Sequence, residues 1–390
     1  MLLRGAKQLL TLRGPSGVRR GAAALNDVGA IQDGSVLIRD GLIAAVGPTR
    51  RIENLKEART AVELSVAGKV VMPAFVDAGL NLENRQAVYS VAPSASGRRS
   101  SKLFQTAGSL LRSCSRHGTL SAELNVTADA FDPHSCLAAF RQLAKIPQSP
   151  VRTIRALRLS RMPDNEVAVK SISEVLTVLA HRKLIQHVEL AADDESRYPA
   201  EELSRVANEA QLGFKLHWRG ESAERLRRLL SCANFWTTYC RCSLSSEECS
   251  VVSRAPSILV FSPGRELFEM SGGTCVRQAV DTGAAIALST GYDATSSPGF
   301  NMQMAIALAV MRLNLTSEET IVAATINAAY ATGCEHLTGS LEVGKDADII
   351  VLDVSDYREL PRQFGINHVD FALRRGETVF DRVPLKLANW

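Results

Sequence analysis

The chain has 390 residues, of which 46% are hydrophobic and 22% charged, and its net charge is only +4. This composition is typical of a globular protein and excludes a disordered, collagen-like or disulfide-rich chain. No basic stripe interleaved with aromatic residues points to nucleic acid, and no apolar run approaches the ~18 residues of a membrane span. The eight cysteines form no C-x-x-C pair, which argues against a zinc knuckle and favours unpaired thiols in the cytoplasm.

The N-terminal region is predicted to be β structure. Residues 1–12 form a first strand, and a basic loop follows at 14–21. An acid-poor, arginine-bearing start is also compatible with a mitochondrial targeting peptide, so both interpretations stay open. Residues 34–41 end in an Asp-Gly hairpin signal and are expected to pair with 42–48, and residues 61–64 form a third β segment.

The middle of the chain alternates short apolar runs with helical patterns. Eight runs are predicted strands, and they cover residues 70–76, 120–126, 153–159, 184–190, 213–218, 235–240, 257–261 and 284–290. Stretches with helical period, such as 172–181, 199–211 and 222–230, lie between them. Alternation repeated eight times predicts an α/β fold, a (β/α)₈ TIM barrel.

The last helix of the barrel has the clearest sequence signals. Thr316 and Glu319 form a capping box, the helix is expected to run to about Ala331, and Gly333 is a suitable stop. β structure then returns at residues 349–352, 369–373 and 378–380. Neither terminal segment can bury a core alone, so residues 1–69 and 336–390 are expected to form one composite β-sandwich domain beside a barrel of residues 70–335.

Four motifs resemble the amidohydrolase superfamily. They lie at residues 33–47, 68–77, 325–333 and 339–353, and residues 356–367 are similar to the imidazolonepropionases. The resemblance implies a barrel hydrolase that cleaves a non-peptide C–N bond of a cyclic amide or amidine in histidine degradation. It also implies one zinc or iron ion at the C-terminal mouth of the barrel. The family's ligands are a His-x-His pair on the first strand, a His on the fifth and an Asp on the eighth.

This sequence departs from the family pattern at most metal-ligand positions. The His-x-His pair is replaced by Gly79 and Asn81, and the eighth-strand Asp is replaced by Gly291. Only the fifth-strand ligand remains, as His217. A lone imidazole binds metal weakly because metal sites use about four ligands. The sequence therefore predicts a pseudoenzyme without a cofactor.

Four other residues are candidates for contact with a small ligand at the barrel mouth. Arg158 stands on the third strand, where the imidazolonepropionases carry a substrate-facing His, and Thr238 aligns with a sixth-strand His. Asp293 lies in the loop that corresponds to the family's substrate loop. Arg85 lies after the first strand, where the resemblance implies an arginine that binds a substrate carboxylate.

Alternative functions remain open at this stage. A metal site could have moved to His187, Glu189 and His217, since His187 and Glu189 have i, i+2 spacing and face one side of a strand. The chain could instead be a non-catalytic protein that binds a small ligand, or a subunit that pairs with a second copy or with an active paralogue. No nucleic-acid or membrane partner is expected.

Overall fold

The computed structural model describes residues 1–82, 96–128, 133–146, 149–159, 166–191, 200–218, 220, 222–232, 235–240, 243–269, 276–294 and 296–383. Eight parallel strands form one sheet in the order β13-β12-β11-β10-β9-β8-β7-β6. Their bounds are β6 Phe75–Asn81, β7 Thr119–Ala128, β8 Arg152–Leu159, β9 His187–Ala191, β10 Gly213–Trp218, β11 Phe235–Cys240, β12 Ile258–Phe261 and β13 Ile286–Leu288. This is the predicted TIM barrel, and its strands follow the predicted runs closely.

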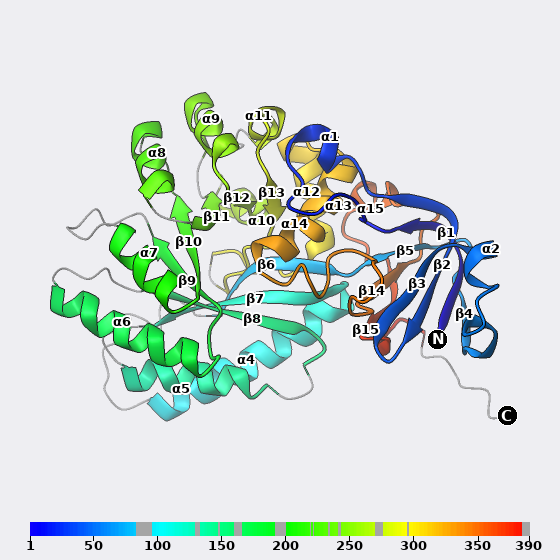
Figure 1. The fold of residues 1–390 in the computed structure, drawn as a ribbon, viewed down its shortest axis with the longest axis horizontal. Helices are drawn as coiled ribbons and strands as arrows, with labels where there is room; N and C mark the ends of the chain where they lie inside the picture. Colours follow the sequence, from blue (N-terminus) through cyan, green and yellow to red (C-terminus); the bar gives the residue numbers. More distant parts are fainter. Residues whose placement is uncertain are drawn as a thin grey trace.

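Helices cover the outside of the barrel between successive strands (Figure 1). They are α4 Ser96–Arg116, α5 Pro133–Ala144, α6 Glu166–His181, α7 Ala200–Glu209, α8 Ala223–Cys232, α9 Ser246–Arg254, α10 Pro263–Phe268 and α11 Val276–Asp281. Three helices follow β13, the last strand of the barrel: α12 Met302–Leu313, α13 Ser317–Ala323 and α14 Ile326–Ala331. None of the helices in the described part of the chain is long and apolar enough to cross a membrane.

The chain ends meet in a second sheet, as predicted. Its strands are β1 Leu2–Leu10, β2 Ala30–Arg39, β3 Leu42–Pro48, β4 Glu63–Ser65, β5 Val70–Pro73, β14 Ile349–Leu352, β15 Val369–Arg374 and β16 Glu377–Asp381. The order is β16-β15-β14-β5-β1-β2-β3, with β4 beside β1. Both N- and C-terminal strands therefore belong to one continuous mixed sheet (Figure 1). The short helices α1 Gly21–Leu25, α2 Thr49–Ile52 and α15 Glu359–Arg362 and the 3₁₀ turn Ala58–Thr60 complete the described elements.

Two predicted elements differ from the structure. The run 70–76 is divided, because β5 pairs with β1 and β14 in the small sheet while β6 begins the barrel. The helix predicted from Thr316 to Ala331 is interrupted at Thr325, whose ψ of −95° is not helical and whose hydroxyl donates to Ile321 O at 2.6 Å. The capping box at Thr316 and the left-handed Gly333 are confirmed.

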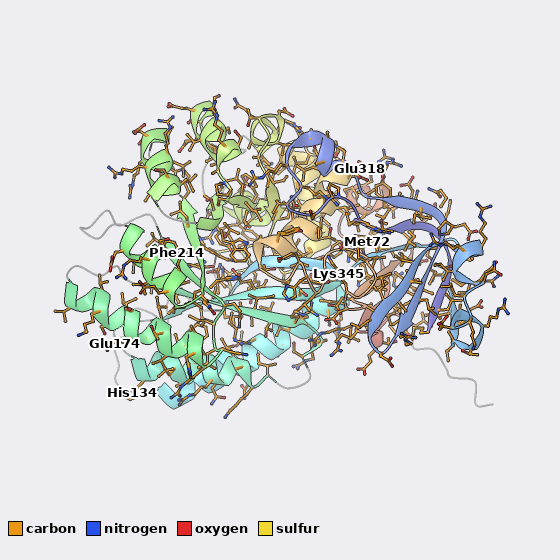
Figure 2. All side chains as sticks on the ribbon, viewed as in Figure 1. Met72, His134, Glu174, Phe214, Glu318 and Lys345 are labelled. Atoms are coloured by element: carbon orange, nitrogen blue, oxygen red, sulfur yellow. The ribbon has the colours of Figure 1, made fainter. Side chains whose placement is uncertain are left out.

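The two sheets share one hydrophobic core. Met72 of β5 and Ile350 of β14 belong to the same buried cluster as Phe214 of β10 and Leu124 of β7. Figure 2 shows Met72 and Lys345 where the small sheet meets the barrel, with His134 and Glu174 on the outer helices. The small domain therefore packs directly against the barrel and fixes its orientation.

Candidate functional site

The mouth of the barrel contains a cavity of about 30 Å³. It is lined from β6, β7, β8, β10, β11, β12, β13 and the loop to α10, by Gly79, Asn81, Asn125, Arg158, His217, Tyr239, Cys240, Val260, Ser262, Arg265, Ser289 and Gly291. The C-terminal ends of barrel strands are where TIM-barrel active sites lie. All four positions predicted from the family's metal ligands, Gly79, Asn81, His217 and Gly291, therefore surround one space.

An ion pair crosses this site below the cavity. Arg158 Nε donates to Glu189 Oε2 at 2.8 Å, and its Nη2 lies 2.8 Å from the same oxygen. His217 Nε2 lies 2.9 Å from Glu189 Oε2 and 3.2 Å from Arg158 Nη2. Burial raises the pKa of the fully buried Glu189, but Arg158 and His217 outweigh burial and hold that pKa well below its usual range. Glu189 is therefore a carboxylate held by two partners.

A second charged cluster lies beside the first, inside the barrel. Glu123 Oε2 accepts from Lys215 Nζ and contacts His187 Nδ1, and Tyr239 OH lies 2.7 Å from Glu123 Oε1. Burial raises the pKa of Glu123, but the charge of Lys215 and the contact with His187 outweigh it, so the net pKa is lowered. Burial and Lys215 also lower the pKa of His187, which favours its neutral form. Paired buried charges of this kind are satisfied groups that hold the strands in place.

The first and last strands of the barrel are joined by Asp77. Its Oδ1 accepts from Gly79 N at 3.1 Å and Thr290 N at 3.1 Å, and its Oδ2 accepts from Thr290 Oγ1 at 2.5 Å. Ser289 Oγ lies 3.0 Å from Asp77 Oδ1. Burial raises the pKa of Asp77 to about 6, against the effect of these donors. Asp77 is thus engaged by structural donors and has little freedom to act as a base.

The two glycines at ligand positions are fixed by their surroundings. Gly291 has φ +61°, and a Cβ there would lie 2.5 Å from Ser262 Cβ. A Cβ on Gly79 would meet Asn125 Nδ2 at 3.3 Å and Tyr239 Cε1 at 3.4 Å. The space of the missing ligand at 291 has therefore been filled by a neighbour, and that at 79 is tight.

The remaining candidate residues have different positions. Arg158 faces the cavity, as predicted. Thr238 does not line it, since its hydroxyl lies 2.9 Å from Ser257 Oγ. Asp293 Oδ1 accepts from Ser296 N at 2.9 Å and so stabilises its own turn. Arg85 lies outside the described residues.

The relocated metal site is not formed. His187 contacts Glu123, whereas His217 contacts Glu189. Throughout the described ranges, no group of three or more His, Cys, Asp or Glu side chains could hold a metal ion. The two histidines therefore belong to separate ion-pair clusters, and this alternative is wrong for the part of the chain that the structure describes.

Tyr239 is a site residue that the sequence prediction missed. Strand β10 pairs with β11 so that His217 is opposite Tyr239, and Thr238 is opposite Leu216. The rings of His217 and Tyr239 stack with centroids 4.5 Å apart and an interplanar angle of 8°. Residues paired in this way point to the same face of a sheet, so the parallel register, had it been known, would have selected Tyr239.

Comparison with known proteins supports the same family. The model of the amidohydrolase family matches residues 262–379. Imidazolonepropionases of Brevibacillus brevis and Alkaliphilus metalliredigens are 27% and 28% identical to this chain, over 97% and 98% of both partners. The chain is similar to the amidohydrolase superfamily along nearly its whole length.

Solved structures of other proteins share the fold of this chain. An E. coli guanine deaminase superposes with a TM-score of 0.69 at 17% identity and covers 98% of this chain and 99% of its own. An atrazine chlorohydrolase of Arthrobacter aurescens, complexed with zinc, superposes with a TM-score of 0.75 at 14% identity, over 97% of this chain and 95% of its own. At these identities the likeness concerns the fold alone.

The donor set of this chain does not fit the metal ion that the resemblance to the family implies. Two of the four ligand positions are glycines, which offer no side-chain donor, and Asn81 offers a neutral oxygen. His217 Nε2 is engaged by Glu189, and the guanidinium of Arg158 lies 3.2 Å from it. A divalent cation at this nitrogen would have no free imidazole lone pair to bind, and the fixed positive charge of Arg158 would repel it.

Proposed function

We propose that this chain is a catalytically degenerate relative of the imidazolonepropionases, which binds rather than hydrolyses. The observation that carries the proposal is the position of Arg158, whose guanidinium lies against both Glu189 and His217. In this arrangement an internal cation neutralises the carboxylate that faces the remaining ligand histidine. The barrel then needs no metal to balance its buried charges.

Among the described residues, the mouth also offers no group in a position to activate water. His217 is engaged by Glu189, and Asp77 accepts from the backbone and hydroxyl donors of β6 and β13. A general base needs a free acceptor within reach of the proton that it removes. Both candidate bases are instead occupied by structural contacts.

The size of the cavity supports a non-hydrolytic role. As bounded by the described residues, its volume of about 30 Å³ is room for about two water molecules. Small-molecule sites usually occupy about 300–1,000 Å³. A binding role is therefore proposed for another part of the surface, for pairing with a second copy, or for pairing with an active paralogue. Cytoplasmic location remains part of the proposal, supported by five buried free cysteines in the described ranges.

Metal content and hydrolysis together test this proposal. Protein expressed in zinc-supplemented medium is expected to contain well below one equivalent of zinc or iron, and to leave imidazolonepropionate unhydrolysed. The double variant Asn81→His/Arg158→Ala is the matched positive control, because it adds an imidazole and uncovers Glu189 beside His217. Three such donors form a zinc site of the open type, so this variant is expected to bind zinc in calorimetric titration. Stoichiometric metal in the wild type that survives chelation, or hydrolysis of the substrate, would overturn the proposal.

A further inference from the structure

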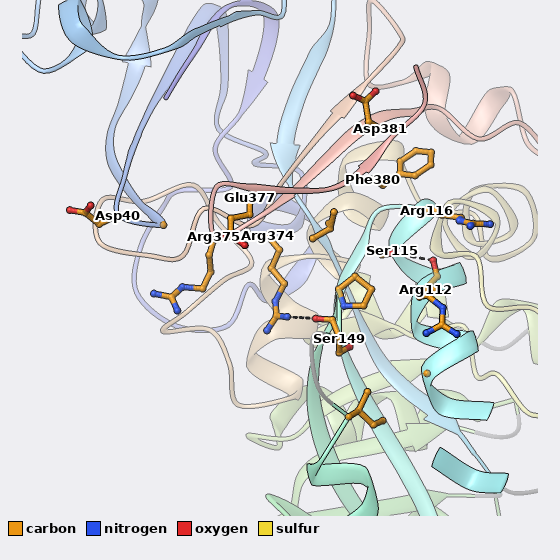
Figure 3. Close-up of a pocket in the computed structure, with 15 residues that line it drawn as sticks. Asp40, Arg112, Ser115, Arg116, Ser149, Arg374, Arg375, Glu377, Phe380 and Asp381 are labelled. Atoms are coloured by element: carbon orange, nitrogen blue, oxygen red, sulfur yellow. Dashed lines mark hydrogen bonds between the residues drawn. The ribbon is translucent and has the colours of Figure 1, made fainter. Parts of the chain in front are cut away.

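A groove of about 1180 Å³ lies at the other end of the barrel from the mouth. It is bounded by the C-terminal end of α4, by Ile146, Ser149 and Pro150 before β8, by the hairpin of β15 and β16, and by the turn at Asp40 (Figure 3). Because α4 ends just before β7 begins, the groove lies at the N-terminal ends of the barrel strands. It is therefore spatially distinct from the Arg158 cluster.

Arg374 is the most constrained cation of this groove. Its Nη1 donates to Ser149 O, while its Nε is buried with no partner among the described residues. The nearby carboxylates of Asp346 and Asp348 are already paired with Arg152, and Asp346 also pairs with Arg375. An arginine held half-buried without its own carboxylate retains donors for an external anion.

A second arginine without a carboxylate partner lies across from Arg374. Arg112 of α4 makes only a long contact of 3.4 Å with Ser109 Oγ in the described part of the chain. Figure 3 shows the guanidinium groups of Arg112 and Arg374 on either side of Ser149. The segment 96–116 contains five basic residues and no acidic one. The dipole of α4 favours a cation at its C-terminus, but it does not account for Arg374 on a separate strand.

The groove also contains carboxylates and an apolar wall. Asp40, Glu377 and Asp381 line it, but Figure 3 shows Asp40 and Asp381 at its two ends and Glu377 beside Arg375. Asp381 Oδ1 accepts from Val383 N at 3.0 Å. Four apolar side chains, Ile146, Pro150, Val379 and Phe380, line the same groove. Positive charge and apolar surface are thus adjacent.

We propose that this groove binds an organic phosphate that carries an apolar or aromatic portion. Arg112 and Arg374 would donate to the phosphate from two sides, since guanidinium groups match phosphate oxygens in bidentate geometry. The apolar portion would lie against Phe380 and Val379. The volume of the groove accommodates a ligand of this class, being slightly above the ~300–1,000 Å³ of ordinary small-molecule sites. The inference goes beyond the proposed loss of hydrolysis and gives the chain a separate binding site.

Titration of the full chain with phenyl phosphate and with inorganic phosphate tests this inference. Both ligands are expected to bind, phenyl phosphate more tightly, with affinity that falls as salt is raised. Arg112→Gln and Arg374→Gln are each expected to weaken binding about tenfold or more, as for the loss of a charge-assisted hydrogen bond. Arg182→Gln is the control for the loss of one positive charge, because Arg182 is exposed and does not line the groove. This control is expected to change the affinity less than about twofold.

Three results would overturn the inference. The first is no binding of phenyl phosphate to the folded wild type. The second is equal affinity in Arg112→Gln, Arg374→Gln and the control Arg182→Gln. The third is equal affinity for phenyl phosphate and inorganic phosphate. Circular dichroism of each variant shows that it is folded. Metal content and hydrolysis concern the barrel mouth and test the proposed function, whereas phosphate binding tests the groove. Failure of one proposal can therefore be recognised independently of the other.

Discussion

Replacement of Arg158 by methionine removes the cation that neutralises Glu189. The side chain of Glu189 has 0% exposure and that of Arg158 has 15%, so the carboxylate cannot reach water. Opposite charges ~4 Å apart attract by about 4 kcal/mol at an effective dielectric constant of ~20. Removing one partner of a buried pair costs about 3–5 kcal/mol, because the other charge is left uncompensated. We therefore expect Arg158→Met to lower the free energy of unfolding by about 3–5 kcal/mol near pH 7.

The pH dependence gives this prediction its sharpest form. In the wild type the lowered pKa of Glu189 contributes stability that is present above its unfolded pKa and is lost as pH falls. In Arg158→Met the guanidinium no longer offsets burial, so the pKa of Glu189 rises and the stability that this carboxylate contributes above its unfolded pKa becomes smaller. The difference between wild type and variant is therefore expected to be smaller in acid than near neutrality.

Urea unfolding followed by tryptophan fluorescence measures these differences. Glu189→Gln removes the uncompensated charge, so Arg158→Met/Glu189→Gln is expected to be more stable near pH 7 than Arg158→Met alone. A cost below about 1 kcal/mol for Arg158→Met, the range of exposed pairs, together with no recovery in the double variant, would refute the reasoning.

Three further predictions concern the seam of the barrel and the last helix. Gly291→Ala is expected to lower the free energy of unfolding by about 2–3 kcal/mol, because alanine is strained at this left-handed φ and its Cβ would contact Ser262 Cβ. Adding Ser262→Gly to this variant should recover part of the loss, as measured by urea unfolding. A pKa of Asp77 raised from 3.8 to about 6 is worth about 3 kcal/mol at 1.36 kcal/mol per pH unit. This contribution is fully present below the pKa of Asp77 in the unfolded state and is lost as pH rises through its pKa in the folded state. Between about pH 4 and 7 the wild type should therefore lose stability relative to Asp77→Asn. Parallel plots of unfolding free energy against pH for the two proteins would contradict this. Thr316→Ala should cost about 1 kcal/mol by losing the cap to Glu319 N, and an unchanged midpoint in thermal unfolding would argue against that contribution.

Strand positions were predictable where the local pattern and the tertiary structure agree. The runs 213–218 and 235–240 coincide with β10 and β11, where residues 214–218 and 237–240 form continuous buried runs. The run 70–76 gave no sign of its division, since β5 and β6 are equally apolar and differ only in which sheet pairs with them. Local periodicity does not indicate which of the two sheets a strand joins.

The candidate site was predictable only in part, for a similar reason. The family motifs placed Gly79, Asn81, His217 and Gly291 around one cavity, and the structure brings them together. The ion pair of Arg158 with Glu189 joins residues on β8 and β9. The alternation of side chains along each strand indicates that both residues point inward, but it does not indicate that they contact each other. Pairing of this kind depends on strand register and side-chain length, which a single sequence leaves undetermined.

The contact between β6 and β13 gives the barrel one wall that differs from the others. These strands form no ladder, and a single bridge between Leu80 and Tyr292 joins their ends. Here the hydroxyl of Thr290 donates a hydrogen bond to the carboxyl group of Asp77, whereas the other neighbouring strands are joined by backbone hydrogen bonds. This wall can therefore open when Asp77 changes protonation or the hydroxyl of Thr290 is lost, while the seven ladders between the eight strands stay intact. The N–H groups of Thr290 and Asn81 donate across this contact, to Asp77 Oδ1 and Tyr292 O. Their amide exchange should then report the opening of this wall well before the whole barrel unfolds.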